Sequence, residues 1–155
     1  MDLGSGSGRD AVYFSRHGFE VTALEPSHSL CEEIHRHFDG EIVCSSIENY
    51  QPVRRFDAVW ACASLLHLTK EELLRFFTEL DKYLKLGGLL YASGKNGIQT
   101  GRCGDGRYFL EFNEALLQEI LEAAAYLEID EVWYSKDVSG RNEFQWMNFV
   151  LKYQE

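Results

Sequence analysis

Residues 2–8 read Asp2-Leu3-Gly4-Ser5-Gly6-Ser7-Gly8, and this stretch decides how the rest of the chain is interpreted. An acid and an apolar residue precede three alternating glycines, and residues 9–17 then have the apolar spacing of a helix. A glycine loop between a strand and a helix lets backbone amides approach a ligand with no Cβ in the way. The segment therefore predicts a ligand site at the start of a helix.

The spacing of the glycines narrows the kind of ligand. Dinucleotide loops follow the pattern GxGxxG, and here Arg9 stands where the third glycine is needed. This spacing argues against a nicotinamide or flavin site. Glu25 follows the apolar run 19–24, about 20 residues after the loop, where a carboxylate can accept hydrogen bonds from both hydroxyls of a ribose.

Beyond the loop, strand-like and helix-like segments alternate. Thr69 and Glu72 form a predicted capping box, and the apolar run FDAVWACA (56–63) predicts a strand buried on both faces. We expect the helix after Thr69 to end at Gly87-Gly88. Further helices are expected over 29–38 and 113–125, further strands over 41–45, 89–93, 127–138 and 145–153, and loops over 94–106 and 139–142. The fold class is α/β: a Rossmann-like three-layer αβα sandwich with a mostly parallel sheet and an antiparallel C-terminal hairpin.

Composition limits the classes of function. The 155 residues fit one domain, and 15 basic against 25 acidic residues give a net charge of -10, which disfavours broad nucleic-acid binding. Four widely spaced cysteines without a CxxC pair predict neither a zinc site nor a disulfide framework, and no metal site is expected. The absence of a long apolar stretch and of a signal peptide predicts a cytoplasmic protein with no membrane partner.

Five segments together resemble the class I S-adenosylmethionine-dependent methyltransferases. They are DLGSGSGRD, VTALEPS, FDAVWACASLLHL, LKLGGLLYAS and the closing pair WYSKDV and WMNFVLKY, so the likeness runs from residue 1 to the C-terminus. Within the class, the chain is most similar to small bacterial methyltransferases, including tellurite-resistance-like ones. The resemblance implies a single methyltransferase domain over residues 1–155 with S-adenosyl-L-methionine as its cofactor.

The resemblance also implies which residues bind the cofactor. Asp2 would lie near the amino group of the methionine moiety, and Glu25 would take the ribose hydroxyls. Ser46 stands where many members have an aspartate that accepts from the adenine amino group, and a serine makes a weaker bond there. The full implied set is Asp2, Gly4, Ser5, Gly6, Gly8, Glu25, Pro26, Ser46, Ile47, Ala61, Cys62 and Ala63.

Three residues are candidates for the chemistry. His67 follows the fourth strand and is the best candidate base, although a packing histidine at a helix start fits the pattern as well. Lys95 could orient an anionic substrate, or it could be a solvated lysine. Tyr108 lies with Arg102 and Arg107 in the loop expected to border the pocket. The three basic residues indicate an anionic small-molecule substrate, and a flexible solvated loop is the alternative.

The front of the chain is short for this family, because Met1 is followed directly by Asp2. The first strand is nearly absent, and the helices that often cover the cofactor are lacking. A fragment or mis-set start, a homodimer or partner that supplies the strand, and a complete but weakly stable chain all fit. We expect weak cofactor binding. Beside methyl transfer to a small molecule or metalloid oxyanion, two alternatives stay open: a degenerate, non-catalytic binding module and a nicotinamide-dependent reductase.

Overall fold

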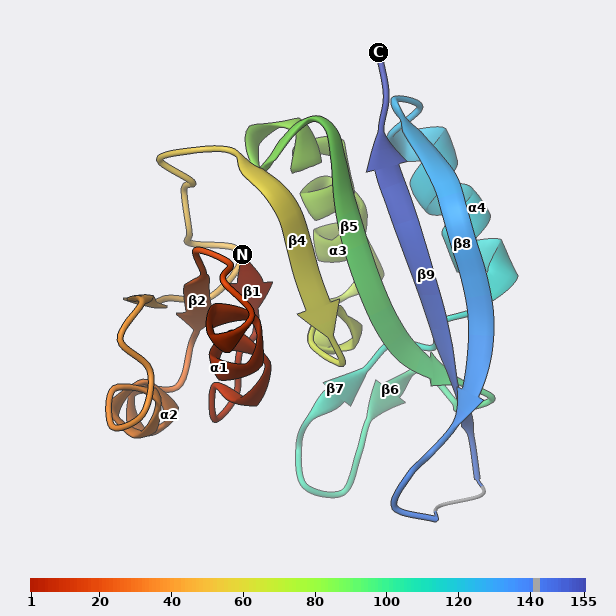
Figure 1. Ribbon diagram of the computed structural model, residues 1–155. Helices are drawn as coiled ribbons and strands as arrows, with labels where there is room; N and C mark the ends of the chain where they lie inside the picture. Colours follow the sequence, from red (N-terminus) through yellow and green to blue (C-terminus); the bar gives the residue numbers. More distant parts are fainter. Residues whose placement is uncertain (141–142) are drawn as a thin grey trace.

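A seven-stranded sheet organises the computed structural model, which describes residues 1–140 and 143–155 (Figure 1). Its strand order is β3-β2-β1-β4-β5-β9-β8. The first five strands pair in parallel, and β9 pairs antiparallel with both β5 and β8. The strands are β1 (Asp2–Leu3), β2 (Thr22–Glu25), β3 (Glu41–Cys44), β4 (Phe56–Cys62), β5 (Leu84–Asn96), β8 (Leu127–Lys136) and β9 (Gln145–Tyr153). The predicted fold class is confirmed.

Helices cover the sheet on both sides, but unequally (Figure 1). On one side lie α1 (Arg9–Arg16) and α2 (His28–Ile34), over the half of the sheet that contains β1, β2 and β3. On the other side lie α3 (Lys70–Thr78) and α4 (Glu114–Ala123), which bury the main core against β4, β5 and β9. The predicted capping box at the start of α3 is present, since Thr69 and Glu72 bond each other's backbone amides.

The first strand has two residues, yet it closes the centre of the sheet. Asp2 and Leu3 pair with Ala23 and Leu24 of β2, and Asp2 also pairs with Trp60 of β4. Leu3 is fully buried. The glycine loop that follows therefore starts at the carboxyl edge of the sheet, where parallel α/β sheets bind ligands.

The expectation that the 56–63 strand is buried on both faces is wrong. Ala58 is exposed and Trp60 is only half-buried. On this side α1 reaches β4 at Trp60 through Phe14 and Asp10, and none of the described helices lies over β5, β9 and β8 (Figure 1). Leu89 of β5 and Ile129 of β8 are 39% and 48% exposed on the same half of the sheet. An apolar run predicts a strand, but its burial depends on what other elements cover.

The expected helix end at Gly87-Gly88 is also wrong. The helix ends at Thr78, a short turn of 3-10 helix (η2, Leu80–Lys82) follows, and β5 already begins at Leu84, which pairs with Phe56. Gly87 has φ +79° where the register between β4 and β5 shifts, so the glycine pair forms an irregularity inside a strand.

The segment expected as the glycine-rich loop 94–106 is more regular than predicted. β5 runs on to Asn96, and a small hairpin follows, with β6 (Gly101–Arg102) paired to β7 (Tyr108–Phe109). Of the expected 139–142 loop, residues 141 and 142 lie outside the described residues. Across the described part of the chain, no helix has the length and apolar character needed to cross a membrane.

Candidate functional site

The glycine loop joins β1 to α1 at the carboxyl edge of the sheet. Gly4, Gly6 and Gly8 have φ angles of +75°, +56° and +83°, a region that residues with side chains rarely adopt. The amides of Gly4 and Ser5 donate to the carbonyl oxygen of Leu24 at 2.8 and 3.0 Å. Backbone hydrogen bonds therefore hold the loop against the end of β2.

The loop leaves room for a ligand at one glycine and none at another. A Cβ on Gly4 would lie 2.4 Å from the Cβ of Ser64, in the turn after β4. A Cβ on Gly6 would meet nothing within 4 Å. The loop thus packs directly on the turn after β4 and opens to solvent at Gly6, which makes a cradle bounded by two segments far apart in sequence.

Glu25, the last residue of β2, is fixed by the same loop. One carboxylate oxygen accepts from the amide of Gly6 at 2.8 Å, and the other accepts from the amide of Ser27 at 2.9 Å. The side chain is buried. Both oxygens are therefore oriented before any ligand binds, and each keeps a lone pair that can accept a hydroxyl hydrogen.

Two buried polar atoms at the loop have no hydrogen-bond partner among the described residues: Oδ2 of Asp2 and Oγ of Ser64. Asp2 is 3% exposed. Burial, and then the nearby carboxylate of Asp10, raise the pKa of Asp2 to about 6. Leaving a buried acceptor unpaired is costly, so this site suits a ligand that brings a cation or donor to Asp2.

The turn after β4 carries backbone strain. Ala63 has φ +53°, the one positive φ of a non-glycine residue in the described part of the chain. Its amide donates to Oγ of Ser93 at 3.0 Å, and Cys62 lies opposite Ser93 in the β4–β5 register. Strained residues gather at functional sites. The turn therefore gives Cys62 and Ala63 a fixed place beside the glycine loop.

The remaining predicted cofactor residues are placed less uniformly. Ala61 is fully buried in the main core, so only its backbone can face a ligand at this end of β4. Pro26 is exposed beside Glu25. Ser46 follows β3, and its hydroxyl accepts from Nδ2 of Asn49 at 3.0 Å. Ile47 is half-buried and packs against the main core.

His67 and Lys95 are brought together at the ring of Phe109, and Tyr108 contacts His67 through its backbone carbonyl. His67 ends a short 3-10 helix, η1 (Leu65–His67), and its ring centroid lies 4.8 Å from that of Phe109. Its Nδ1 lies 2.9 Å from the carbonyl oxygen of Tyr108. Because a carbonyl oxygen can only accept, Nδ1 carries the hydrogen and Nε2 of the neutral ring is left as a base.

The three basic residues of this region differ in how they are engaged. Arg102 donates to the carbonyl oxygen of Gly106 at 2.8 Å, and Arg107 is paired with Asp105. The Lys95 ammonium lies 4.1 Å from the centroid of the Phe109 ring. No acidic side chain of the described residues pairs with it.

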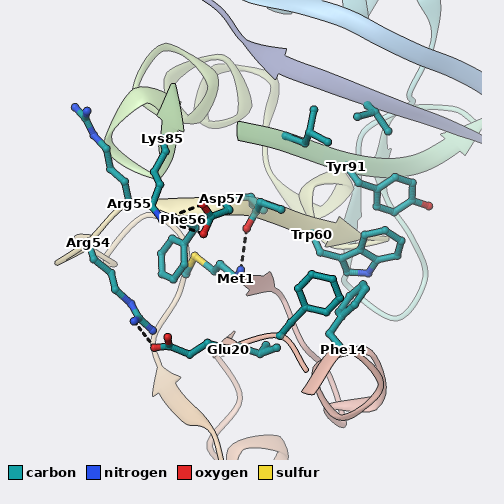
Figure 2. A pocket seen from close by; sticks show the side chains of 16 residues that line it. Met1, Phe14, Glu20, Arg54, Arg55, Phe56, Asp57, Trp60, Lys85 and Tyr91 are labelled. Atoms are coloured by element: carbon teal, nitrogen blue, oxygen red, sulfur yellow. Dashed lines mark hydrogen bonds and ion pairs between the residues drawn. The ribbon is translucent and has the colours of Figure 1, made fainter. Parts of the chain in front are cut away.

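A cavity of about 650 Å³ lies away from these residues. Figure 2 shows it beside the amino-terminal part of β4, on the half of the sheet that lacks a covering helix on the side of α1 among the described residues. We call this the open half of the sheet. Trp60 and Tyr91 stack there with ring centroids 3.9 Å apart, and the amino group of Met1 donates to the carbonyl oxygen of Ala58 at 2.8 Å. Neither the glycine loop nor Glu25 lines it. We place the functional site at the loop, because the oriented and unpartnered polar atoms are there.

Several residues of the site were missed in the sequence. Ser64 directly follows the predicted 56–63 strand, and its position was a usable signal. Ser93 was assigned only as the end of a strand. Phe109 and Phe144 come from the small hairpin and from the segment before β9, and no local pattern indicates that their rings meet at Lys95.

Comparisons with known proteins point to a methyltransferase domain. The sequence profile described as "Methyltransferase domain" matches residues 1–92, which include the glycine loop, Glu25 and β4. The ubiquinone biosynthesis O-methyltransferase of Bradyrhizobium sp. (strain ORS 278) is 32% identical over 101 residues, 62% of this chain and 39% of that protein. The chain thus spans about two fifths of that curated relative.

Solved structures share the fold at low sequence identity. Burkholderia thailandensis 1,6-didemethyltoxoflavin-N1-methyltransferase, solved with 1,6-didemethyltoxoflavin and S-adenosylhomocysteine, superposes with a TM-score of 0.82 at 20% identity, over 99% of this chain and 70% of that one. The [4+2]-cyclase SpnF superposes with 0.77 at 18% identity, over 99% and 73%. The fold alone therefore does not fix the reaction. Since the profile covers more than half of its residues, this chain belongs to the methyltransferase domain family.

Proposed function

We propose that this chain binds S-adenosylmethionine at the glycine loop and transfers its methyl group to a small-molecule acceptor. The observation that carries the proposal is the hydrogen bond from the Gly6 amide to Glu25, next to the unpartnered Oδ2 of Asp2. When bound, S-adenosylmethionine would offer its ribose diol to the Glu25 carboxylate and its ammonium to the Asp2 carboxylate.

The residues present fit this cofactor. Gly4, Ser5, Gly6 and Gly8 would lie along the methionine moiety and the ribose, and the loop leaves open space at Gly6. Asp2 would pair with the ammonium, and Glu25 would accept from both ribose hydroxyls. Adenine would lie beside Pro26, Ser46 and Ile47, and the backbone of Ala61 with Cys62 and Ala63 would form the floor.

When bound, the cofactor supplies a methyl group already activated on a sulfonium. An acceptor heteroatom that took this methyl group would have to lose its proton. The chain's part is to position the acceptor and to take that proton. Nε2 of His67 is proposed as the base, because Nδ1 is held at the Tyr108 carbonyl. Tyr108 would border the acceptor.

Three observations support a small-molecule acceptor. The 1,6-didemethyltoxoflavin-N1-methyltransferase, which shares the fold, was solved with a small molecule, 1,6-didemethyltoxoflavin, bound. The chain's net charge is -10, which opposes a phosphate backbone. The cations Arg102 and Arg107 are engaged within their own loop, so they do not form a broad basic surface.

The experiment is a thermal-shift and calorimetric comparison of S-adenosylhomocysteine with NADH, followed by transfer of labelled methyl groups to a broad acceptor panel. Binding of S-adenosylhomocysteine but not NADH, with transfer to at least one acceptor, is expected. Preference for NADH would favour a reductase. Binding without transfer to any acceptor would identify a non-catalytic module. Either result would overturn the proposal.

A further inference from the structure

The acceptor side of the site is organised around the ammonium of Lys95. Lys95 lies two residues beyond Ser93 in β5, so it faces the same side of the sheet as Ser93, and it is paired in register with Trp146 of β9. Ser93 in turn holds the amide of Ala63. Lys95 is thus next, on this side of the strand, to the residue that holds the turn after β4.

Two aromatic rings from different segments flank this ammonium. Nζ lies 4.1 Å from the centroid of the Phe109 ring and 4.8 Å from that of Phe144. Phe109 belongs to β7, whereas Phe144 immediately precedes β9. A lysine between two ring faces is held by its attraction to the π-electrons, yet its three N–H donors gain no anionic partner from the rings.

The carboxylates of this region are engaged with other groups. Asp105 is paired with Arg107, and Asp137 accepts from the indole Nε1 of Trp146 at 3.1 Å. Glu111 accepts from the amide of Gly97 at 3.0 Å and from Nδ2 of Asn113 at 3.2 Å. The ammonium therefore lies half-buried beside aromatic rings with no ion-pair partner among the described residues, in a chain that is otherwise strongly acidic.

From this geometry we infer that the acceptor is an organic acid whose anionic group pairs with Lys95, while the rings of Phe109 and Phe144 hold the ammonium in place. A charge-assisted hydrogen bond would give the ammonium the anionic partner that it lacks. Lys95 is then a specificity-determining residue. The inference rests on the proposed function, since it names the acceptor of that site.

The test measures binding to the protein saturated with S-adenosylhomocysteine. The probes are salicylate, 4-hydroxybenzoate and 3,4-dihydroxybenzoate, the methyl ester of each, and selenite. At least one acid is expected to bind more tightly than its ester. Lys95→Met should weaken binding of that acid about tenfold, the order of one charge-assisted bond, and leave the ester unchanged.

Lys85→Met is the matched control, because Lys85 lies in the same strand and is paired with Asp57 at the opposite end. It should leave acid binding unchanged. Lys95→Arg keeps the charge and should retain the preference for the acid, which guards against a folding defect in Lys95→Met. Equal binding of acids and esters, binding of selenite alone, no acid binding, or an unchanged acid affinity in Lys95→Met would overturn the inference. S-adenosylhomocysteine affinity, measured in each variant, separates this failure from failure of the proposed function.

Discussion

The two ends of β4 differ in what they offer a ligand. At the amino-terminal end, Ala58 and Trp60 border a cavity of about 650 Å³ on the open half of the sheet (Figure 2). At the carboxyl end, the turn at Ala63 and Ser64 packs so closely on the glycine loop that Gly4 has no room for a Cβ. The amino-terminal end therefore offers a ligand a large cavity, whereas the carboxyl end offers it oriented polar atoms. We therefore place the proposed chemistry by unsatisfied hydrogen-bonding groups rather than by cavity size.

The largest effect is expected from a substitution that fills the space between the glycine loop and the turn after β4. Gly4→Val places side-chain atoms where a Cβ alone would lie 2.4 Å from the Cβ of Ser64, at a φ of +75°. Calorimetry should detect no S-adenosylhomocysteine binding. Gly18→Ala is the matched control, because Gly18 also has a positive φ but nothing within 4 Å of its Cβ position. It should lower the free energy of unfolding by about 1 kcal/mol and leave the affinity unchanged.

Removing Glu25, the proposed ribose-binding acid, should have the next largest effect. Glu25→Gln puts an amide NH₂ opposite one of the two backbone amides that now donate to the carboxylate. One backbone amide and one ligand hydroxyl therefore lose their hydrogen-bond acceptor. S-adenosylhomocysteine affinity should fall roughly 10- to 100-fold. Glu33→Gln on the exposed side of α2 is the control. Equal affinities in the two variants would remove Glu25 from the site.

A pH dependence tests Asp2, whose pKa is raised to about 6 by burial and by Asp10. The ligand's ammonium needs the ionised carboxylate, so affinity should fall about tenfold per pH unit below that pKa. Asp2→Asn should bind more weakly at pH 8 and show no such pH dependence. A wild-type affinity that does not change between pH 5 and 8 would contradict this role.

The same carboxyl group affects stability in the opposite sense. A folded-state pKa above the unfolded value of 3.8 means that the contribution of Asp2 to stability is present below 3.8 and is lost as pH rises to about 6. Asp2→Asn removes the buried charge, so its melting temperature at pH 8 should exceed that of the wild type by a few degrees, and the difference should shrink at pH 4. Equal melting temperatures at both values would show that ionised Asp2 carries no burial penalty.

The smallest effect is expected from a change in β5, at the cavity beside the amino-terminal end of β4. Leu89 is 39% exposed on the open half of the sheet and lines the large cavity. Leu89→Ser should change the free energy of unfolding by about 0.5 kcal/mol or less and leave the S-adenosylhomocysteine affinity unchanged. A clear loss of affinity would show that the two ends of β4 form one site.

The features at the carboxyl end of β4 could be predicted from the sequence, because they depend on local patterns of residues. The spacing of the glycines and the position of Glu25 depend on residues close together in the chain, and the structure joins them by one hydrogen bond. The capping box at Thr69 is local in the same way. Both features follow from backbone geometry that a short segment dictates.

The remaining features depend on contacts between segments far apart in the chain, and the sequence predicted those features poorly. The apolar run of β4 gave no sign that one of its faces is open, because coverage depends on where distant helices lie. Gly87 was interpreted as a helix end, although pairing of Leu84 with Phe56 makes the segment a strand. Phe109 and Phe144 meet at Lys95 only through the arrangement of the C-terminal strands.

Calorimetric titration of S-adenosylhomocysteine into the wild type, Gly4→Val and Leu89→Ser tests the central claim most directly. The account predicts one site per chain in the wild type and in Leu89→Ser, with equal affinity, and no binding in Gly4→Val. Binding that survives in Gly4→Val but is lost in Leu89→Ser would place the cofactor at the large cavity and contradict the account.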